Sequence, residues 1–260
     1  MSVSARGQLR RLARVAGFGA ITGVMLPAYA LRDALAKGGE RDEVRDRWIR
    51  RWSGALLALF EVRVRLAGAI PPSVGERGTL VVANHRSTID IAVLLHTFGG
   101  YMVSRADLAR WPLVGVAARK VNTVFVDRGD AMSGASALRA VRDLLKKGRT
   151  VSIFAEGTTF ADDEVRPFHA GAFLAALRTG AQLLPVGIAY ERGSGAAFVN
   201  ESFPQHLARM SAAPPTRVVV RIGEPQVVDE RARAAQLRDR ARAAVQALVY
   251  EARALSDAEK

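Results

Sequence analysis

His85 and Asp90 stand five positions apart in the segment 84–90, whose sequence is NHRSTID. A histidine can accept a proton near neutral pH, and a carboxylate that binds one ring nitrogen fixes the tautomer of the other. This pair is the base half of the serine-hydrolase arrangement, without the nucleophilic hydroxyl. It favours a reaction in which the substrate brings the hydroxyl. A helix-capping aspartate beside an ordinary turn histidine is the alternative for this spacing alone.

The neighbouring residues predict that this pair lies in a turn between a strand and a helix. The run 79–83 (TLVVA) is apolar, which predicts a buried strand. Ser87 and Thr88 are typical N-cap residues, and the apolar spacing after them predicts a helix over 87–97. In such a turn, the side chain of His85 can reach a pocket while helix amides face outward.

After residue 60, strand-like and helix-like segments alternate, which predicts an α/β fold with a largely parallel central sheet flanked by helices. We expect segment 193–215 to be a variable loop and Asp229 to open a final amphipathic helix. The predicted strands are 62–66, 79–83, 101–104, 123–126, 151–154, 183–190 and 217–222, and the predicted helices are 87–97, 106–118, 131–147 and 167–178.

The N-terminal segment has the character of a membrane anchor. Residues 1–14 hold four arginines and no acid, and 15–31 form an uncharged run of 17 residues. A span needs roughly 20 apolar residues, so this run is borderline. Trp48 and Trp52 would share one helix face beside arginines, which suits a membrane interface.

We therefore predict two parts, a helical anchor over 1–60 and a main domain over 61–260. The anchor is expected to be a pair of helices that lies in the membrane or barely spans it. Two alternatives remain open for this segment. It could be a signal peptide cleaved after Ala28-Tyr29-Ala30, or an ordinary buried helical hairpin.

The net charge and the residue types of the chain limit the classes of molecule that it could bind. The net charge of +13 favours nucleic acid, anionic lipid or acidic substrates, but no aromatic–basic interleaving or nucleic-acid motif accompanies it. We therefore expect a membrane surface as the partner and no nucleic acid. Cysteine is absent, and the four histidines show no zinc-binding spacing, so we expect no metal.

A second polar segment ends a strand-like run at 124–128 (VFVDR). The guanidinium of Arg128 can hold a phosphate through two parallel hydrogen bonds. Taken alone, the Asp-Arg pair would more often be a local salt bridge. The segment adds a candidate anion contact to the histidine and aspartate.

A third segment, 154–159 (FAEGTT), also follows a strand-like run. Glu156 offers an acceptor, Thr158 offers a hydroxyl, and Gly157 lets the backbone approach a ligand closely. The fourth segment, 184–186 (LPV), opens a strand with a rigid proline. Each of the two has a plain structural explanation when taken alone, as a turn with a cap and as a strand start.

In this order, the four segments resemble the blocks of the lysophosphatidic acid acyltransferase family of glycerolipid acyltransferases, which are NHx4D, F[IV]DR, FPEGTR and VPV. The resemblance covers roughly residues 60–225, and the first and third blocks are specific. It implies that 61–260 is an acyltransferase domain with His85 as general base and Asp90 as its partner. It also implies substrate contacts by Asn84, Arg128, Glu156, Gly157 and Thr158.

The resemblance further implies O-acyl transfer without a covalent intermediate, metal or prosthetic group. The acyl donor would be acyl-CoA or acyl carrier protein, and the acceptor a lysolipid at the cytoplasmic face of the cell membrane. His85 would remove the proton of the lysolipid hydroxyl, and amides at the Ser87 helix start would stabilise the oxyanion. The expected acceptor is 1-acyl-sn-glycerol 3-phosphate, giving phosphatidic acid in phospholipid biosynthesis.

Three departures from the family pattern bear on the acceptor. Ala155 replaces a proline, Thr159 replaces an arginine, and His169 stands where lysine is common. Two cations near the headgroup are therefore missing, and the FAEGTT block resembles that of lyso-ornithine lipid acyltransferases. Another lysolipid such as lyso-ornithine lipid is thus the alternative acceptor. The alternative of another class is a non-catalytic, basic peripheral membrane protein.

Overall fold

The computed structural model describes residues 4–71, 77–111, 114–127, 129–198, 200–228 and 231–258. Its centre is a sheet with the strand order β1-β7-β6-β2-β5-β3-β4, and β8 pairs with β6. All neighbours are parallel except β6–β7 and β6–β8, which are antiparallel. The predicted α/β fold with a largely parallel sheet is confirmed. The strands are β1 (Val62–Ala67), β2 (Thr79–Ala83), β3 (Tyr101–Arg105), β4 (Val124–Val126), β5 (Thr150–Phe154), β6 (Gln182–Tyr190), β7 (Thr216–Ile222) and β8 (Gln226–Val227).

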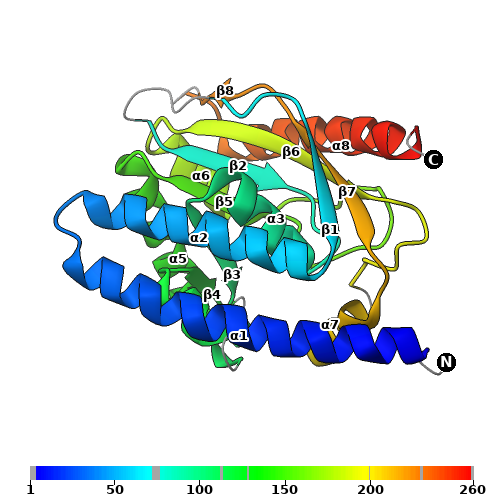
Figure 1. Ribbon diagram of the computed structural model, residues 1–260. Helices are drawn as coiled ribbons and strands as arrows, with labels where there is room; N and C mark the ends of the chain where they lie inside the picture. Colours follow the sequence, from blue (N-terminus) through cyan, green and yellow to red (C-terminus); the bar gives the residue numbers. More distant parts are fainter. Residues whose placement is uncertain are drawn as a thin grey trace.

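Helices cover both faces of the sheet, with α1 and α2 side by side on one face and α8 on the other (Figure 1). The alternation of β2 explains this arrangement, because Val81 and Ala83 pack toward α2 and α3 while Leu80 and Val82 pack toward α5, α6 and α8. The helices are α1 (Ala5–Leu35), α2 (Glu40–Leu59), α3 (Ile89–Phe98), α4 (Val114–Lys120), α5 (Ala131–Lys146), α6 (Gly171–Leu177), α7 (Phe203–Ala212) and α8 (Ala234–Asp257), with a 3₁₀ helix, η1 (Ala106–Arg110).

Several predicted element boundaries are wrong. The helix expected over 106–118 is divided into η1 and α4, and the one expected over 167–178 is only α6. The expected loop at 193–215 contains α7, and the sequence analysis missed β8. Asp229, expected to open the last helix, lies outside the described residues, and α8 begins at Ala234.

The two predicted N-terminal helices are present as α1 and α2. Among the described residues, α1 is the one helix long and apolar enough to cross a membrane by length and composition. Its outward face carries many apolar side chains, and the large exposed apolar residues of α1 are Leu9, Leu12, Val15, Val24, Leu31 and Leu35. A face of this kind is typical of a helix that contacts lipid.

Helix α1 is also part of the folded domain. The side chain of Arg14 is 3% exposed. Its guanidinium donates hydrogen bonds to the carbonyl oxygens of Met210 and Ala213, at 3.2 and 2.7 Å, where α7 ends. It also pairs with Glu61 at 2.7 Å. Tyr29 packs against Trp48 of α2 with ring centroids 4.9 Å apart. The division at residue 60 therefore separates elements that pack closely on each other.

Candidate active site

The candidate site begins where β2 ends, at the carboxyl end of the parallel strands. Asn84 is completely buried there. Its side-chain nitrogen donates to the carbonyl of Ile188 at 2.9 Å, and its side-chain oxygen accepts from the amide of Ile188 at 2.8 Å. These two bonds continue the β2–β6 pairing into the turn. Asn84 therefore fixes the position of the next residue, His85, relative to β6.

His85 and Asp90 form a hydrogen-bonded pair, with 2.9 Å between Nδ1 and Oδ2. The ring of His85 stacks on Phe154, which ends β5, with centroids 3.9 Å apart and planes 5° apart. Asp90 is fully buried, whereas the side chain of His85 is 16% exposed. The carboxylate therefore holds Nδ1 from behind and leaves Nε2 as the ring nitrogen for a substrate proton.

Three more donors hold the Asp90 carboxylate. Its Oδ2 atom accepts the amides of Arg86 and Ser87, at 2.6 and 2.8 Å. Its Oδ1 atom accepts the hydroxyl of Tyr190 at 2.6 Å. Burial first, and then the Asp90 charge, raise the pKa of Tyr190, so the phenol stays protonated. Of the helix-start amides expected to stabilise an oxyanion, that of Ser87 already donates to Asp90, and the expectation for the amides that follow it stays a prediction.

Glu156 lies beneath the turn and joins it to the third sequence block. Its Oε1 atom accepts the amide of His85 at 2.8 Å and the guanidinium of Arg86 at 3.2 Å. Its Oε2 atom accepts the amide of Arg166 at 2.9 Å. The carboxylate is thus occupied by the protein itself, and it orients the backbone on which the histidine is carried.

The remaining predicted site residues lie on or near the pocket. Gly157 has a φ of +85°, a left-handed conformation that favours glycine, and it follows Glu156 directly. Gly157 and Thr158 line the same pocket as His85, whereas Asn84 and Glu156 are buried behind it. Arg128 lies outside the described residues, so its predicted phosphate contact stays a prediction. Thr159 donates its hydroxyl to the carbonyl of Phe198.

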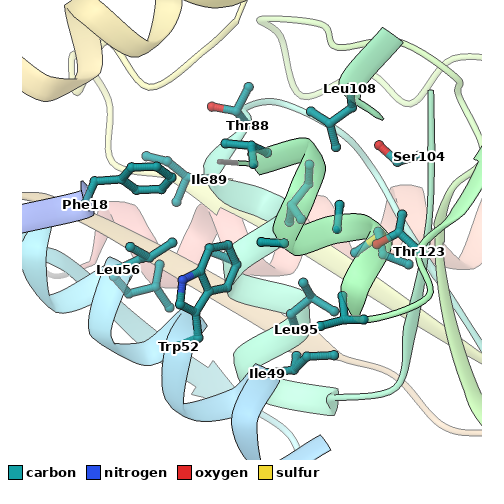
Figure 2. Close-up of a pocket in the computed structure, with 18 of the residues that line it drawn as sticks. Phe18, Ile49, Trp52, Leu56, Thr88, Ile89, Leu95, Ser104, Leu108 and Thr123 are labelled. Atoms are coloured by element: carbon teal, nitrogen blue, oxygen red, sulfur yellow. The ribbon is translucent and has the colours of Figure 1, made fainter. Parts of the chain in front are cut away.

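The pocket next to His85 has a volume of about 450 Å³ and carries both polar and apolar side chains. An apolar cavity of about 160 Å³ lies beside it, between the helical pair and α3 and α4 (Figure 2). Phe18, Trp52 and Leu56 of the helical pair point into this cavity (Figure 2). The two spaces share the lining residues Thr88, Ile91, Ser104, Leu108 and Phe203. An apolar chain can therefore run from the histidine toward α1 and α2.

A second histidine–carboxylate pair lies behind the same turn. Nδ1 of His206 is 2.8 Å from Oε1 of Glu201, and its Nε2 is 3.4 Å from Oγ of Ser87. The nearby guanidinium of Arg209 is the largest cause that lowers the pKa of Glu201, and burial lowers the pKa of His206. His206 is completely buried, so its ring links α7 to the turn and does not face the pocket, whereas Glu201 lines the pocket.

Sequence reasoning missed Tyr190, Arg86 and the wall formed by α7. A capping box signals that helix, because Ser202 and Gln205 carry the required side chains and Pro204 suits a first helical turn. No pattern marks Tyr190, because its partner Asp90 is 100 positions away. No group of three or more histidine, aspartate or glutamate side chains among the described residues is placed to hold a metal ion.

Comparison with known proteins identifies the class of this site. Residues 61–189 match the family model described as Acyltransferase. The lyso-ornithine lipid O-acyltransferase of Pseudomonas aeruginosa is 34% identical over 225 residues, which are 84% of each chain. At this identity and coverage, the chain belongs to the acyltransferase family that includes the lysophosphatidic acid acyltransferases, and it is an acyltransferase enzyme.

Two further proteins are similar to this chain. The 1-acyl-sn-glycerol-3-phosphate acyltransferase of Neisseria meningitidis is 28% identical, over 75% of this chain and 73% of that one. The crystal structure of the 1-acyl-sn-glycerophosphate acyltransferase PlsC from Thermotoga maritima superposes with a TM-score of 0.71 at 24% identity, covering 94% of this chain and 97% of that one. The latter likeness supports the fold.

Proposed function

We propose that this acyltransferase moves a fatty acyl group from a thioester donor to the free hydroxyl of a lysolipid, with His85 as general base. The observation that carries the proposal is the pair of His85 and Asp90, 2.9 Å apart, at the wall of a pocket that continues into an apolar cavity. A polar headgroup and an apolar chain can both be accommodated on the two sides of the histidine. This arrangement suits an amphiphilic substrate.

The chemical step follows from the ring geometry. Nε2 of His85 removes the hydroxyl proton as the hydroxyl oxygen attacks the thioester carbonyl, while Asp90 stabilises the imidazolium that forms. The tetrahedral intermediate then expels the thiolate, which receives the proton from the imidazolium. The products are the diacyl lipid and a free thiol. Acyl-CoA or acyl carrier protein would supply the thioester, and no residue of the enzyme is acylated.

The remaining predicted site residues divide by position. We propose that Asn84 and Glu156 position the turn, because their side chains bond to the protein. Gly157 and Thr158 line the pocket and are placed to contact the headgroup. We also place the enzyme at the cytoplasmic face of the cell membrane, where acyl-CoA and acyl carrier protein are found. The apolar outer face of α1 would enter the lipid.

Two lysolipids are candidate acceptors. Lysophosphatidate is supported by the Asp127-Arg128 block and by the glycerolipid acyltransferases among the relatives. Lyso-ornithine lipid is supported by the Pseudomonas aeruginosa relative, whose name gives that lipid as its acceptor. Its headgroup has a free carboxylate and a free ammonium, so recognition needs both cationic and anionic side chains.

The described pocket walls favour the second acceptor. They carry Arg105, Asp107 and Glu201, which present both signs of charge. Thr159, which stands where the family has arginine, is bonded to the carbonyl of Phe198 and adds no cation. Asp107 is paired with Arg105 and Glu201 with Arg209, so these walls offer both signs of charge to a zwitterion and less net positive charge than a phosphate dianion requires. We therefore propose lyso-ornithine lipid as the better fit of the two.

The test is an acyl-transfer assay that offers each lysolipid with acyl-CoA and with acyl carrier protein. His85→Ala should abolish transfer to whichever acceptor is used. His96→Ala is the matched control, because His96 lies on α3, the helix that follows the His85 turn, is exposed and bonds the carbonyl of Arg50. Turnover by a folded His85→Ala protein would remove the proposed mechanism. Transfer to neither lysolipid by the unaltered enzyme would show that the acceptor is a different lipid.

A further inference from the structure

The two oxygens of the Asp90 carboxylate accept different numbers of hydrogen bonds. Oδ2 accepts the imidazole of His85 and the amides of Arg86 and Ser87, at 2.9, 2.6 and 2.8 Å. Oδ1 is held by one side chain from another part of the chain, the hydroxyl of Tyr190 at 2.6 Å. This bond is short and buried, as expected when the acceptor is ionised. The orientation of the carboxylate therefore depends on β6 as well as on its own helix.

The pairing of β6 with β2 positions the Tyr190 hydroxyl next to Asp90. Strand β6 runs parallel to β2, with Val186 opposite Ala83. Beyond the last paired residues, the side chain of Asn84 makes both of its bonds to the backbone of Ile188. Tyr190 is two residues further along β6 and 6% exposed. Its ring therefore has little freedom, and its hydroxyl is fixed relative to the turn that carries the base.

We propose that Tyr190 is a positioning residue for acyl transfer, acting on His85 through Asp90. Its hydroxyl stops the carboxylate from rotating and withdraws part of its charge, so that Oδ2 stays aligned with Nδ1 of His85. The inference rests on the proposed role of His85 as the base. Tyr190 does not line the pocket next to the histidine, so it acts on the rate of proton transfer and not on substrate binding.

Removal of this hydroxyl makes the Asp90 carboxylate a stronger partner for a charged imidazole. With one donor fewer, more negative charge stays on the carboxylate. The base must be neutral to act, so the acidic limb of the pH–rate profile should move to higher pH. The other charged or titratable groups around the turn are left in place by a Tyr190→Phe change; they are Arg86, Arg105, Asp107, Glu156, Glu201 and His206.

Tyr190→Phe and Tyr101→Phe form a matched pair of variants. Tyr101 is also buried, at 7% exposure, and donates its hydroxyl to a carboxylate, Asp42, at 2.9 Å. It begins β3, so it lies at the opposite end of the parallel strands from the site. Both variants lose one buried hydroxyl that is bonded to an aspartate. A general loss of stability should therefore affect both equally, whereas a positioning effect should appear only at Tyr190.

At a pH above the acidic limb, the kcat of Tyr190→Phe should be about 10- to 100-fold lower, because misalignment of the carboxylate outweighs its larger charge; this is the scale of one hydrogen bond to a charged group. The KM for the lysolipid should stay within about twofold. Tyr101→Phe should retain wild-type kcat. A wild-type kcat for Tyr190→Phe, an equal loss in Tyr101→Phe, or a loss confined to KM would overturn the proposal. If His85→Ala is inactive while Tyr190→Phe is normal, only this inference fails and the proposed function stands.

A second variant covers the case in which Tyr190→Phe does not fold. Replacing Tyr190 with 3,5-difluorotyrosine keeps the ring and the hydroxyl but makes the hydroxyl a stronger donor. More charge is then withdrawn from Asp90, so the acidic limb should move to lower pH, opposite to the phenylalanine variant. An unmoved limb in a folded difluorotyrosine protein would refute the coupling between Tyr190 and His85.

Discussion

Replacement of Asp90 by asparagine removes the negative charge of the side chain while keeping its shape nearly unchanged. The sequence alone suggests that an amide would stabilise the wrong histidine tautomer. In the structure, the Oδ2 position faces two backbone amides as well as the histidine. An asparagine must place its oxygen there, because its NH₂ group would face these donors. The NH₂ group then occupies the Oδ1 position, where the hydroxyl of Tyr190 can turn to accept from it.

The expected loss is therefore the loss of one negative charge beside the imidazolium. Two unit charges about 4 Å apart attract by roughly 4 kcal/mol at an effective dielectric constant of about 20. The hydrogen bond to a neutral oxygen remains and recovers a part of this. A barrier higher by about 3–4 kcal/mol corresponds to a fall in kcat of roughly 100- to 1,000-fold. A wrong tautomer costs more, about 10⁴-fold in a serine-protease triad.

The assay is steady-state acyl transfer by Asp90→Asn, compared with His85→Ala and with the control Asp42→Asn. Asp42 also accepts a tyrosine hydroxyl, but it lies on α2 at the far end of the sheet. Thermal unfolding of all three variants checks that the fold persists. A kcat for Asp90→Asn as low as that of His85→Ala would show that the amide is turned the other way. A kcat equal to wild type would show that the charge is not needed.

Four further predictions, three on substitutions and one on membrane extraction, test other parts of the structure. Glu156→Gln should lower kcat about tenfold, because a neutral acceptor holds the His85 amide less firmly; an unchanged kcat would contradict the positioning role. Arg14→Met should lower the free energy of unfolding by about 3 kcal/mol, since it removes a buried cation from several carbonyl acceptors; chemical denaturation measures this. The protein should stay with membranes in about 1 M salt and leave them in detergent, because apolar contacts are not screened; release by salt alone would exclude apolar anchoring. Thr159→Arg should raise kcat/KM for lysophosphatidate and lower it for lyso-ornithine lipid, and the opposite result would reverse the choice of acceptor.

The fold was largely predictable because the sequence patterns that indicate its strands and helices are local. The strands around the site are short apolar runs, and the polar segments after β2 and β5 stand where such strands end. The contact between His85 and Asp90 was predictable for the same reason, since both lie within one turn. Helix α7 was missed although Ser202 and Gln205 marked its start, because its surroundings are rich in small and polar residues.

Long-range contacts were not predictable, because no local pattern encodes them. The hydroxyl of Tyr190 reaches Asp90 only after β6 has paired with β2. Glu156 was expected to contact substrate, yet its carboxylate bonds the His85 backbone, which depends on how two turns meet. The tertiary structure thus decides whether a polar side chain in a motif faces the pocket or supports the turn behind it.

The docking of α1 restricts how a detergent-free form of the enzyme could be engineered. Deleting the helix would expose the α7 carbonyl groups that Arg14 covers, and it would remove Phe18 from the apolar cavity. The outward side chains of the helix are different, because Leu12 and Leu31 are 70% and 64% exposed and lie away from the domain. Polar substitutions on that side alone should convert α1 into an ordinary surface helix. Such an enzyme should still acylate soluble short-chain lysolipids in water.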